Sequence, residues 1–113
     1  GELGSRDEGV FDLKQDQGGI ADIEFIVQYA VLRWSDEQPA LLEYTDNIRI
    51  LDGLVQANLL SEKEGKLLAD AYRIYRSRLH RCVLEDSAEQ VGADEYVDLR
   101  KAVMNIWQKW FSN

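Results

Sequence analysis

The sequence contains one cysteine, one histidine and one proline. The lone Cys82 excludes a disulfide within the chain and a zinc site built from several cysteines. With His80 as the only histidine, the ligand set for a metal ion is poor, and helix spacing places no serine or cysteine nucleophile beside it. We therefore expect no metal site and no catalytic residue within this chain, so an independent helical enzyme is the least favoured function.

Long hydrophobic runs are also missing. No apolar stretch approaches the roughly 18 residues that span a membrane, and no basic and apolar leader opens the sequence. The hydrophobic content of 45% is typical of a globular domain and disfavours disorder. These features predict a soluble, cytoplasmic domain without a membrane partner.

Positive charge is scarce, because 13 lysines and arginines face 21 aspartates and glutamates, for a net charge of −8. The average field of such a domain repels a polyanion. We therefore expect no nucleic-acid partner, and any phosphate contact requires a local basic patch.

The spacing of the apolar residues predicts an all-α fold, a compact bundle of four main helices with short connecting turns. The expected helices run from Ile20 to about Trp34, from about Thr45 to Ala57, from Ser61 to about Leu84 or Asp86, and from about Asp94 to Phe111. Ser61 and Glu64 form a capping-box pattern, and Asn58 suits a left-handed helix end. No strand pattern competes, and residues 87–92 are expected to form a loop.

The polar segment 1–17 has the composition of an interdomain connector at the start of a fragment, and residues 18–113 form the expected bundle domain. Within the connector, only Val10, Phe11 and Leu13 are available to dock on the bundle.

The first expected helix is apolar on two sides. Its second apolar side carries Phe25, Tyr29 and Leu32, so something must cover this helix nearly all round. Asp22 and Glu24 are two positions apart, about 200° around a helix, so they cannot converge on one metal ion. They either complement the helix dipole or lie beside a site on another domain.

Gly18 and Gly19 precede this helix and permit two interpretations. They form a plain turn, or they present backbone N–H groups to a phosphate with Lys14 as an added cation. Neither the P-loop nor the dinucleotide fingerprint accompanies them, so the phosphate signal is weak.

The third expected helix carries Lys66, Arg73, Arg76 and His80 along one outer face. They are either a solvated surface with Glu62 and Asp70 as salt-bridge partners, or a patch that meets phosphates or an acidic partner surface. In the last helix, Trp107 and Trp110 belong to the core and its rim or form an exposed partner contact.

Several spaced motifs together carry a resemblance that covers the chain from about residue 11 to its end. The motifs are Lys14-x-Asp16-x-Gly18-Gly19-Ile20-x-Asp22-Ile23-Glu24-Phe25-x-x-Gln28-Tyr29, Thr45-Asp46-Asn47-x-x-x-Leu51, Ala71-Tyr72-x-x-x-Arg76-x-x-x-His80-Arg81 and Trp107-Gln108-Lys109-Trp110. In this order they resemble the bacterial glutamine synthetase adenylyltransferase/adenylyl-removing enzymes. Looser versions of the first and third motifs resemble the related PII uridylyltransferases.

The resemblance implies that this chain is the helical domain after the second, C-terminal catalytic half of such an enzyme. The parent would transfer AMP from ATP to a tyrosine of glutamine synthetase and remove it by phosphorolysis, under the control of PII and glutamine. Glutamine synthetase, PII and the chain's own upstream catalytic domain are the implied partners.

The same resemblance implies ATP and Mg²⁺ for the parent but no cofactor in this fragment. The family's catalytic pattern is Gly-Ser…Asp-x-Asp on a sheet, whereas here Gly4-Ser5 is followed by no Asp-x-Asp. The catalytic carboxylates are therefore expected upstream, in a nucleotidyltransferase domain absent from this chain, and the isolated fragment is expected to be inactive.

Eight residues occupy positions of the family's motifs and form the candidate site: Lys14, Asp16, Gly18, Gly19, Asp22, Glu24, Arg76 and His80. Our hypothesis is that they build the seam between bundle and catalytic domain, with the glycine turn facing the nucleotide site and Phe25, Tyr29 and Leu32 covered by that domain. In the alternative, the chain is a regulatory module without a catalytic role, which contacts glutamine synthetase or PII through Lys66, Arg73, Arg76 and His80 or through its tryptophans.

Overall fold

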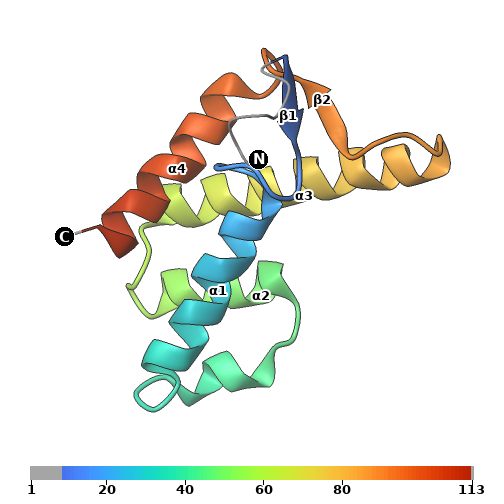
Figure 1. The fold of residues 1–113 in the computed structure, drawn as a ribbon. Helices are drawn as coiled ribbons and strands as arrows, with labels where there is room; N and C mark the ends of the chain where they lie inside the picture. The colour runs from blue at the N-terminus through green and yellow to red at the C-terminus, as the bar shows by residue number, and fades with distance from the viewer. Residues whose placement is uncertain (1–8, 113) are drawn as a thin grey trace.

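The computed structural model of the chain describes residues 9–112. Helices dominate this part, which confirms the all-α prediction (Figure 1). The elements are β1 (Val10–Asp12), α1 (Ile20–Trp34), the short 3-10 helix η2 (Pro39–Glu43), α2 (Asn47–Gln56), α3 (Glu62–Leu84), β2 (Gln90–Gly92) and α4 (Val97–Phe111).

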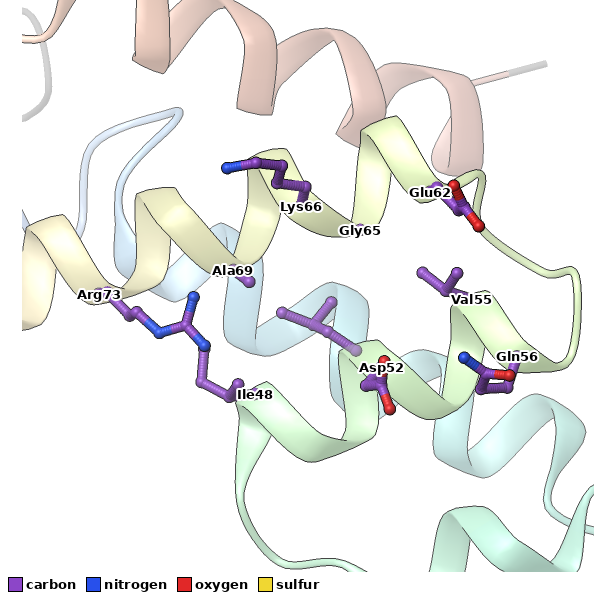
Figure 2. Close-up of a pocket in the computed structure, with 10 residues that line it drawn as sticks. Ile48, Asp52, Val55, Gln56, Glu62, Gly65, Lys66, Ala69 and Arg73 are labelled. Carbon is purple, nitrogen blue, oxygen red and sulfur yellow. The ribbon is translucent and has the colours of Figure 1, made fainter.

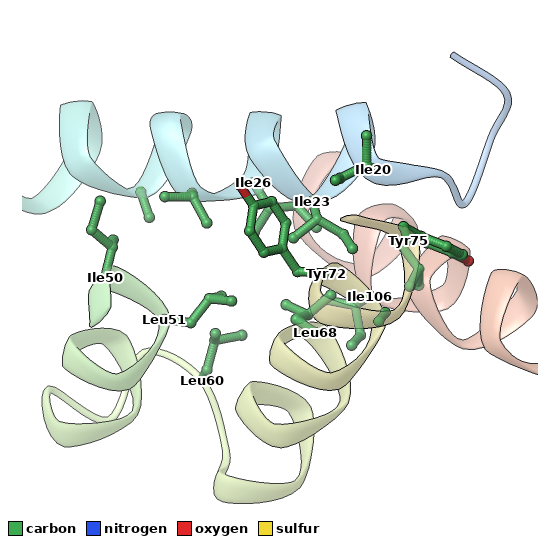
Figure 3. Close-up of a cluster of buried hydrophobic side chains, with 14 of the residues drawn as sticks. Ile20, Ile23, Ile26, Ile50, Leu51, Leu60, Leu68, Tyr72, Tyr75 and Ile106 are labelled. Carbon is green, nitrogen blue, oxygen red and sulfur yellow. The ribbon is translucent and has the colours of Figure 1, made fainter. Parts of the chain in front are cut away.

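The long helix α3 packs against all three other main helices, α1, α2 and α4. Helix α1 crosses α3 and contacts α2 and α4 as well (Figure 1). Ile23 and Ile26 of α1 meet Leu51 of α2 and Leu68 of α3 in the buried core (Figure 3). The apolar spacing of each helix thus supplies one face of a shared core.

The sequence predicted no strand, and a loop at residues 87–92. This prediction is wrong, because β1 and β2 are two short strands. β1 and β2 pair antiparallel, with Phe11 opposite Val91. The Leu13 N–H donates to the Glu89 carbonyl at 3.0 Å and so continues the ladder. Three-residue strands are too short to show an alternating pattern, so the pairing arises from tertiary packing.

The described part of the expected connector belongs to the fold. Phe11 and Leu13 are both 0% exposed and lie in the core. The sequence marked both residues as available to dock on the bundle, but it did not predict that they would be completely buried. Residues 1–8 of the connector, including Gly4-Ser5, lie outside the described residues, so the interdomain role of residues 1–17 stays a prediction.

Most of the expected helix ends are confirmed. Ser61 Oγ accepts from the Glu64 N–H at 3.0 Å while Glu64 Oε1 accepts from the Ser61 N–H at 3.1 Å, which completes the capping box. Asn58 has the expected left-handed backbone, with φ of 63°. Helix α4 begins at Val97 rather than Asp94, because Tyr96 before it has φ of 59°.

The apolar spacing of α3 predicts Val83 on its inner face, but the structure shows this residue exposed. Val83 is 67% exposed, and the neighbouring Leu84 is 72% exposed. The last turns of α3 extend beyond the other helices (Figure 1), and only part of their surface is covered, since Cys82 there is buried.

The second apolar side of α1 is partly covered by aromatic residues of α4. The Phe25 ring lies 5.1 Å from Trp107, and the Tyr29 ring lies 5.0 Å from Phe111 and 6.2 Å from Trp110. Both tryptophans are therefore at the rim of the core. Phe25 remains 51% exposed and Leu32 83% exposed, so their burial by another domain stays a prediction.

Candidate functional site

The glycine turn before α1 uses its own backbone donors. Gly18 N–H donates to Asp22 Oδ2 at 2.8 Å, and Gly19 N–H donates to the Asp16 carbonyl at 2.9 Å. The next two N–H groups, of Ile20 and Ala21, donate to the carbonyls of Leu13 at 2.9 Å and Lys14 at 3.1 Å. None of these four amides is left for a phosphate, which favours the plain-turn interpretation.

Close packing explains why both positions are glycine. Gly18 has φ of +83°, and a Cβ atom there would lie 2.6 Å from the Arg100 carbonyl oxygen of α4. A Cβ atom on Gly19 would lie 2.6 Å from the Leu13 carbonyl oxygen. The turn therefore packs directly against α4 and against the residue that follows β1, at the start of α1.

Asp22 and Glu24 diverge, as helix geometry predicts. Asp22 holds the Gly18 N–H and lines a cleft beside Trp107 and Gln108 of α4. Desolvation raises the pKa of the Asp22 carboxyl, and the Gly18 hydrogen bond opposes this change in part. Glu24 instead faces a different pocket, which contains Lys14 and Arg76.

This second pocket has a volume of about 480 Å³ and gathers residues from four separate parts of the chain. We call it the Lys14–Arg76 pocket. The turn after β1, helix α1, the start of α2 and helix α3 all contribute to it. It is lined by Lys14, Ile20, Glu24, Thr45, Asp46, Asn47, Tyr72, Arg76 and Leu79.

Hydrogen bonds and a ring contact fix one wall of the Lys14–Arg76 pocket. Asn47 Nδ2 donates to the Tyr72 hydroxyl at 2.9 Å, and the Arg76 guanidinium lies 5.8 Å from the centre of the Tyr72 ring. Asp46 is engaged as the cap of α2, where its Oδ1 accepts from the Ile48 N–H at 2.9 Å. Asn47 therefore holds the Tyr72 ring in place, and the ring in turn positions Arg76.

The charged groups of the Lys14–Arg76 pocket remain available to a partner. Lys14 Nζ lies 3.9 Å from Glu89, a loose surface contact. Within residues 9–112, neither Arg76 nor Glu24 has an ion-pair partner. Two cations, one free carboxylate and an oriented amide suit the binding of a polar or anionic surface, whereas no activated nucleophile is present.

The other predicted basic residues lie elsewhere. Lys66 and Arg73 both approach Asp70, at 2.7 and 3.7 Å, which supports the solvated salt-bridge interpretation for these two. They line a separate pocket of about 320 Å³ between α2 and α3 (Figure 2). His80 is exposed. The four predicted contact residues of α3, Lys66, Arg73, Arg76 and His80, therefore do not line one common pocket.

Sequence reasoning missed Asn47 and Tyr72 as site residues. Both belong to the motifs Thr45-Asp46-Asn47 and Ala71-Tyr72, but neither side chain is charged, so neither was predicted as a contact residue. The signal was their occurrence in the same ordered motifs as Lys14 and Arg76.

Two classes of site are not found in the part of the chain that the structure describes. No group of three or more histidine, cysteine, aspartate or glutamate side chains there could hold a metal ion. Among its helices, none has the length and apolar character needed to cross a membrane.

Comparison with known proteins decides the family. A profile of the GlnD PII-uridylyltransferase family matches residues 6–91. The chain belongs to this family. The match includes the glycine turn, the α2 start and α3, which together build the Lys14–Arg76 pocket.

Its relatives within this wider family carry a more specific name, bifunctional glutamine synthetase adenylyltransferase/adenylyl-removing enzyme. The protein of Pseudomonas syringae pv. tomato is 58% identical over 97 residues, which are 86% of this chain and 10% of the relative. The Thioalkalivibrio sulfidiphilus protein is 47% identical over 108 residues, 96% of this chain and 11% of the relative. The chain thus spans about a tenth of the length of the curated relatives it matches.

Proposed function

We propose that this chain is the C-terminal helical domain of a bifunctional glutamine synthetase adenylyltransferase/adenylyl-removing enzyme. The whole protein transfers AMP from ATP to a tyrosine of glutamine synthetase and removes it by phosphorolysis. Identities of 58% and 47% to proteins of that name support this choice over the uridylyltransferase named by the family profile.

Within that enzyme, the domain supports the catalytic domain and meets it at the Lys14–Arg76 pocket. The observation that carries this role is the convergence of Lys14, Glu24, Asn47 and Arg76 from four chain segments on one open pocket. All four come from the motifs shared with the adenylyltransferases. A structural surface alone does not need Arg76 and Glu24 to line one pocket without an ion-pair partner among residues 9–112.

The chemistry itself belongs to another part of the protein. ATP and Mg²⁺ are the proposed cofactors of the upstream catalytic domain, as the resemblance to the adenylyltransferases implies. Glutamine synthetase and PII are the proposed partners of the whole enzyme. The cytoplasm is its proposed location, in keeping with the single unpaired Cys82.

The test separates the two transfer reactions of the family. The full-length protein that contains this chain is incubated with glutamine synthetase and radiolabelled ATP, and in parallel with PII and radiolabelled UTP. We expect label on glutamine synthetase and its release by inorganic phosphate. Label on PII and none on glutamine synthetase would contradict the proposal.

A further inference from the structure

The second half of α3 is strongly basic in an acidic chain. Residues 71–84 contain four arginines and His80 but no aspartate or glutamate. Subtracting these four positive charges from the net charge of −8 leaves −12 on the rest of the chain. This half helix is therefore a concentrated positive surface in a negative surrounding.

Three of these arginines line one open groove, away from the Lys14–Arg76 pocket. Arg73, Ser77 and Arg81 follow each other at four-residue intervals and so share one side of the helix. The groove has a volume of about 320 Å³ and is lined by Arg73, Ile74, Ser77, Arg78, Arg81 and Tyr96. We call it the arginine groove.

The arginine groove keeps much of its binding capacity free. Arg81 has no ion-pair partner within residues 9–112, and Arg73 has only the 3.7 Å contact with Asp70, which Lys66 holds at 2.7 Å. Ile74 beside them is 40% exposed. Arg78 differs, since it donates to Glu95 at 3.0 Å and to the Tyr96 hydroxyl at 3.4 Å and thereby forms a fixed edge.

The spacing of Arg73 and Arg81 along α3 suits an extended ligand. Eight residues of α-helix separate Arg73 and Arg81 by about 12 Å along the axis. A ligand with two separated acidic groups pairs with both arginines without drawing their side chains together. In an extended peptide, residues four apart lie about 13 Å from each other, which matches the separation of the two arginines.

We propose that the arginine groove binds an acidic polypeptide segment that also carries an apolar side chain for Ile74. Guanidinium groups pair with carboxylates through two parallel hydrogen bonds. A nucleic acid fits less well, because the negative domain repels a long polyanion and because Tyr96 is the only aromatic ring that lines the groove for base stacking. The inference does not depend on the proposed adenylyl transfer.

The test measures binding of labelled probes to the 113-residue chain by fluorescence anisotropy. The main probe is a peptide of about twelve residues in which glutamate and leucine alternate at every second position, with serine between them. When the peptide is extended, its glutamates lie four residues apart and share one face with the leucines. The same peptide with glutamine in place of glutamate tests whether binding requires negative charge. Oligouridine RNA tests whether the groove binds a nucleic acid instead.

Two double variants place the binding site. Arg73→Gln/Arg81→Gln is expected to weaken binding of the acidic peptide about tenfold or more, as expected for loss of two charge-assisted contacts. Lys63→Gln/Lys101→Gln removes the same charge from two other exposed positions and should leave affinity within about twofold, because screening limits distant charges. Unchanged circular dichroism confirms that both variants fold. Equal losses in the two variants, no peptide binding, or tighter binding of RNA would overturn the proposal.

Discussion

At the scale of single residues, the glycine turn shows how one position can require a residue type. Gly18 combines a left-handed backbone with direct contact to the backbone of α4. The sequence alone indicated a turn here. It could not show that α4, about 80 residues later in the chain, packs against this turn.

Gly18→Ala is expected to destabilise the fold by about 2 kcal/mol or more. The left-handed conformation alone costs a non-glycine residue about 1–2 kcal/mol, and the new Cβ would collide with the Arg100 carbonyl. Urea unfolding measures the change. Gly53→Ala in α2 is the control, because its Cβ would meet only the Leu41 side chain at 3.3 Å. A Gly18→Ala variant as stable as the Gly53→Ala variant would refute this account of the turn.

Asp22 is expected to make the stability of the domain depend on pH. Because desolvation raises its folded-state pKa above the ordinary 3.8, the ionised carboxylate opposes folding, and this effect disappears at pH values below 3.8. Asp22→Asn cannot ionise and can still accept from Gly18. The free energy of unfolding of wild type minus that of the variant should therefore fall as pH rises from below 3.8 through the raised pKa. A difference that is constant or rises with pH would contradict the assignment.

At the scale of elements, the sequence predicted the four main helices well and the strands not at all. Long amphipathic repeats and caps are local signals, so α1 and the start of α3 could be placed from them. The pairing of β1 with β2 depends on contacts between residues 80 positions apart, which no local pattern contains.

The capping box is expected to stabilise α3 measurably. Ser61→Ala removes the acceptor of the Glu64 N–H and should cost about 1 kcal/mol in urea unfolding. Ser77→Ala in the middle of the same helix is the matched control and should change stability by less than about 0.5 kcal/mol. Equal effects of the two substitutions would show that the cap contributes nothing.

The β1 segment is expected to be part of the cooperative core rather than a detachable connector. Leu13→Ala should lower the free energy of unfolding by about 2–5 kcal/mol, because Leu13 is fully buried. Leu32→Ala, at a position 83% exposed, should have little effect on the described bundle. If the Leu13 variant unfolds like the Leu32 variant, the segment does not contribute to the core.

At the scale of the whole molecule, the candidate residues separate into three places. The glycine turn is structural, Lys14, Glu24 and Arg76 meet in one pocket, and Lys66 and Arg73 lie on another side of α3. Sequence spacing could place each residue on its helix. It could not show which helices meet, so the assignment of residues to a common pocket required the structure.

In the proposed function, the Lys14–Arg76 pocket is where this domain supports adenylyl transfer. The direct measurement is kcat/KM for AMP transfer to glutamine synthetase by the full-length enzyme with Lys14→Gln/Arg76→Gln, beside the control Lys63→Gln/Arg49→Gln at exposed positions. We predict a loss of about tenfold or more, equivalent to about 1.4 kcal/mol, in the pocket variant alone, with unchanged stability. Wild-type transfer by the pocket variant, with only its response to PII altered, would contradict the claim and favour the regulatory alternative.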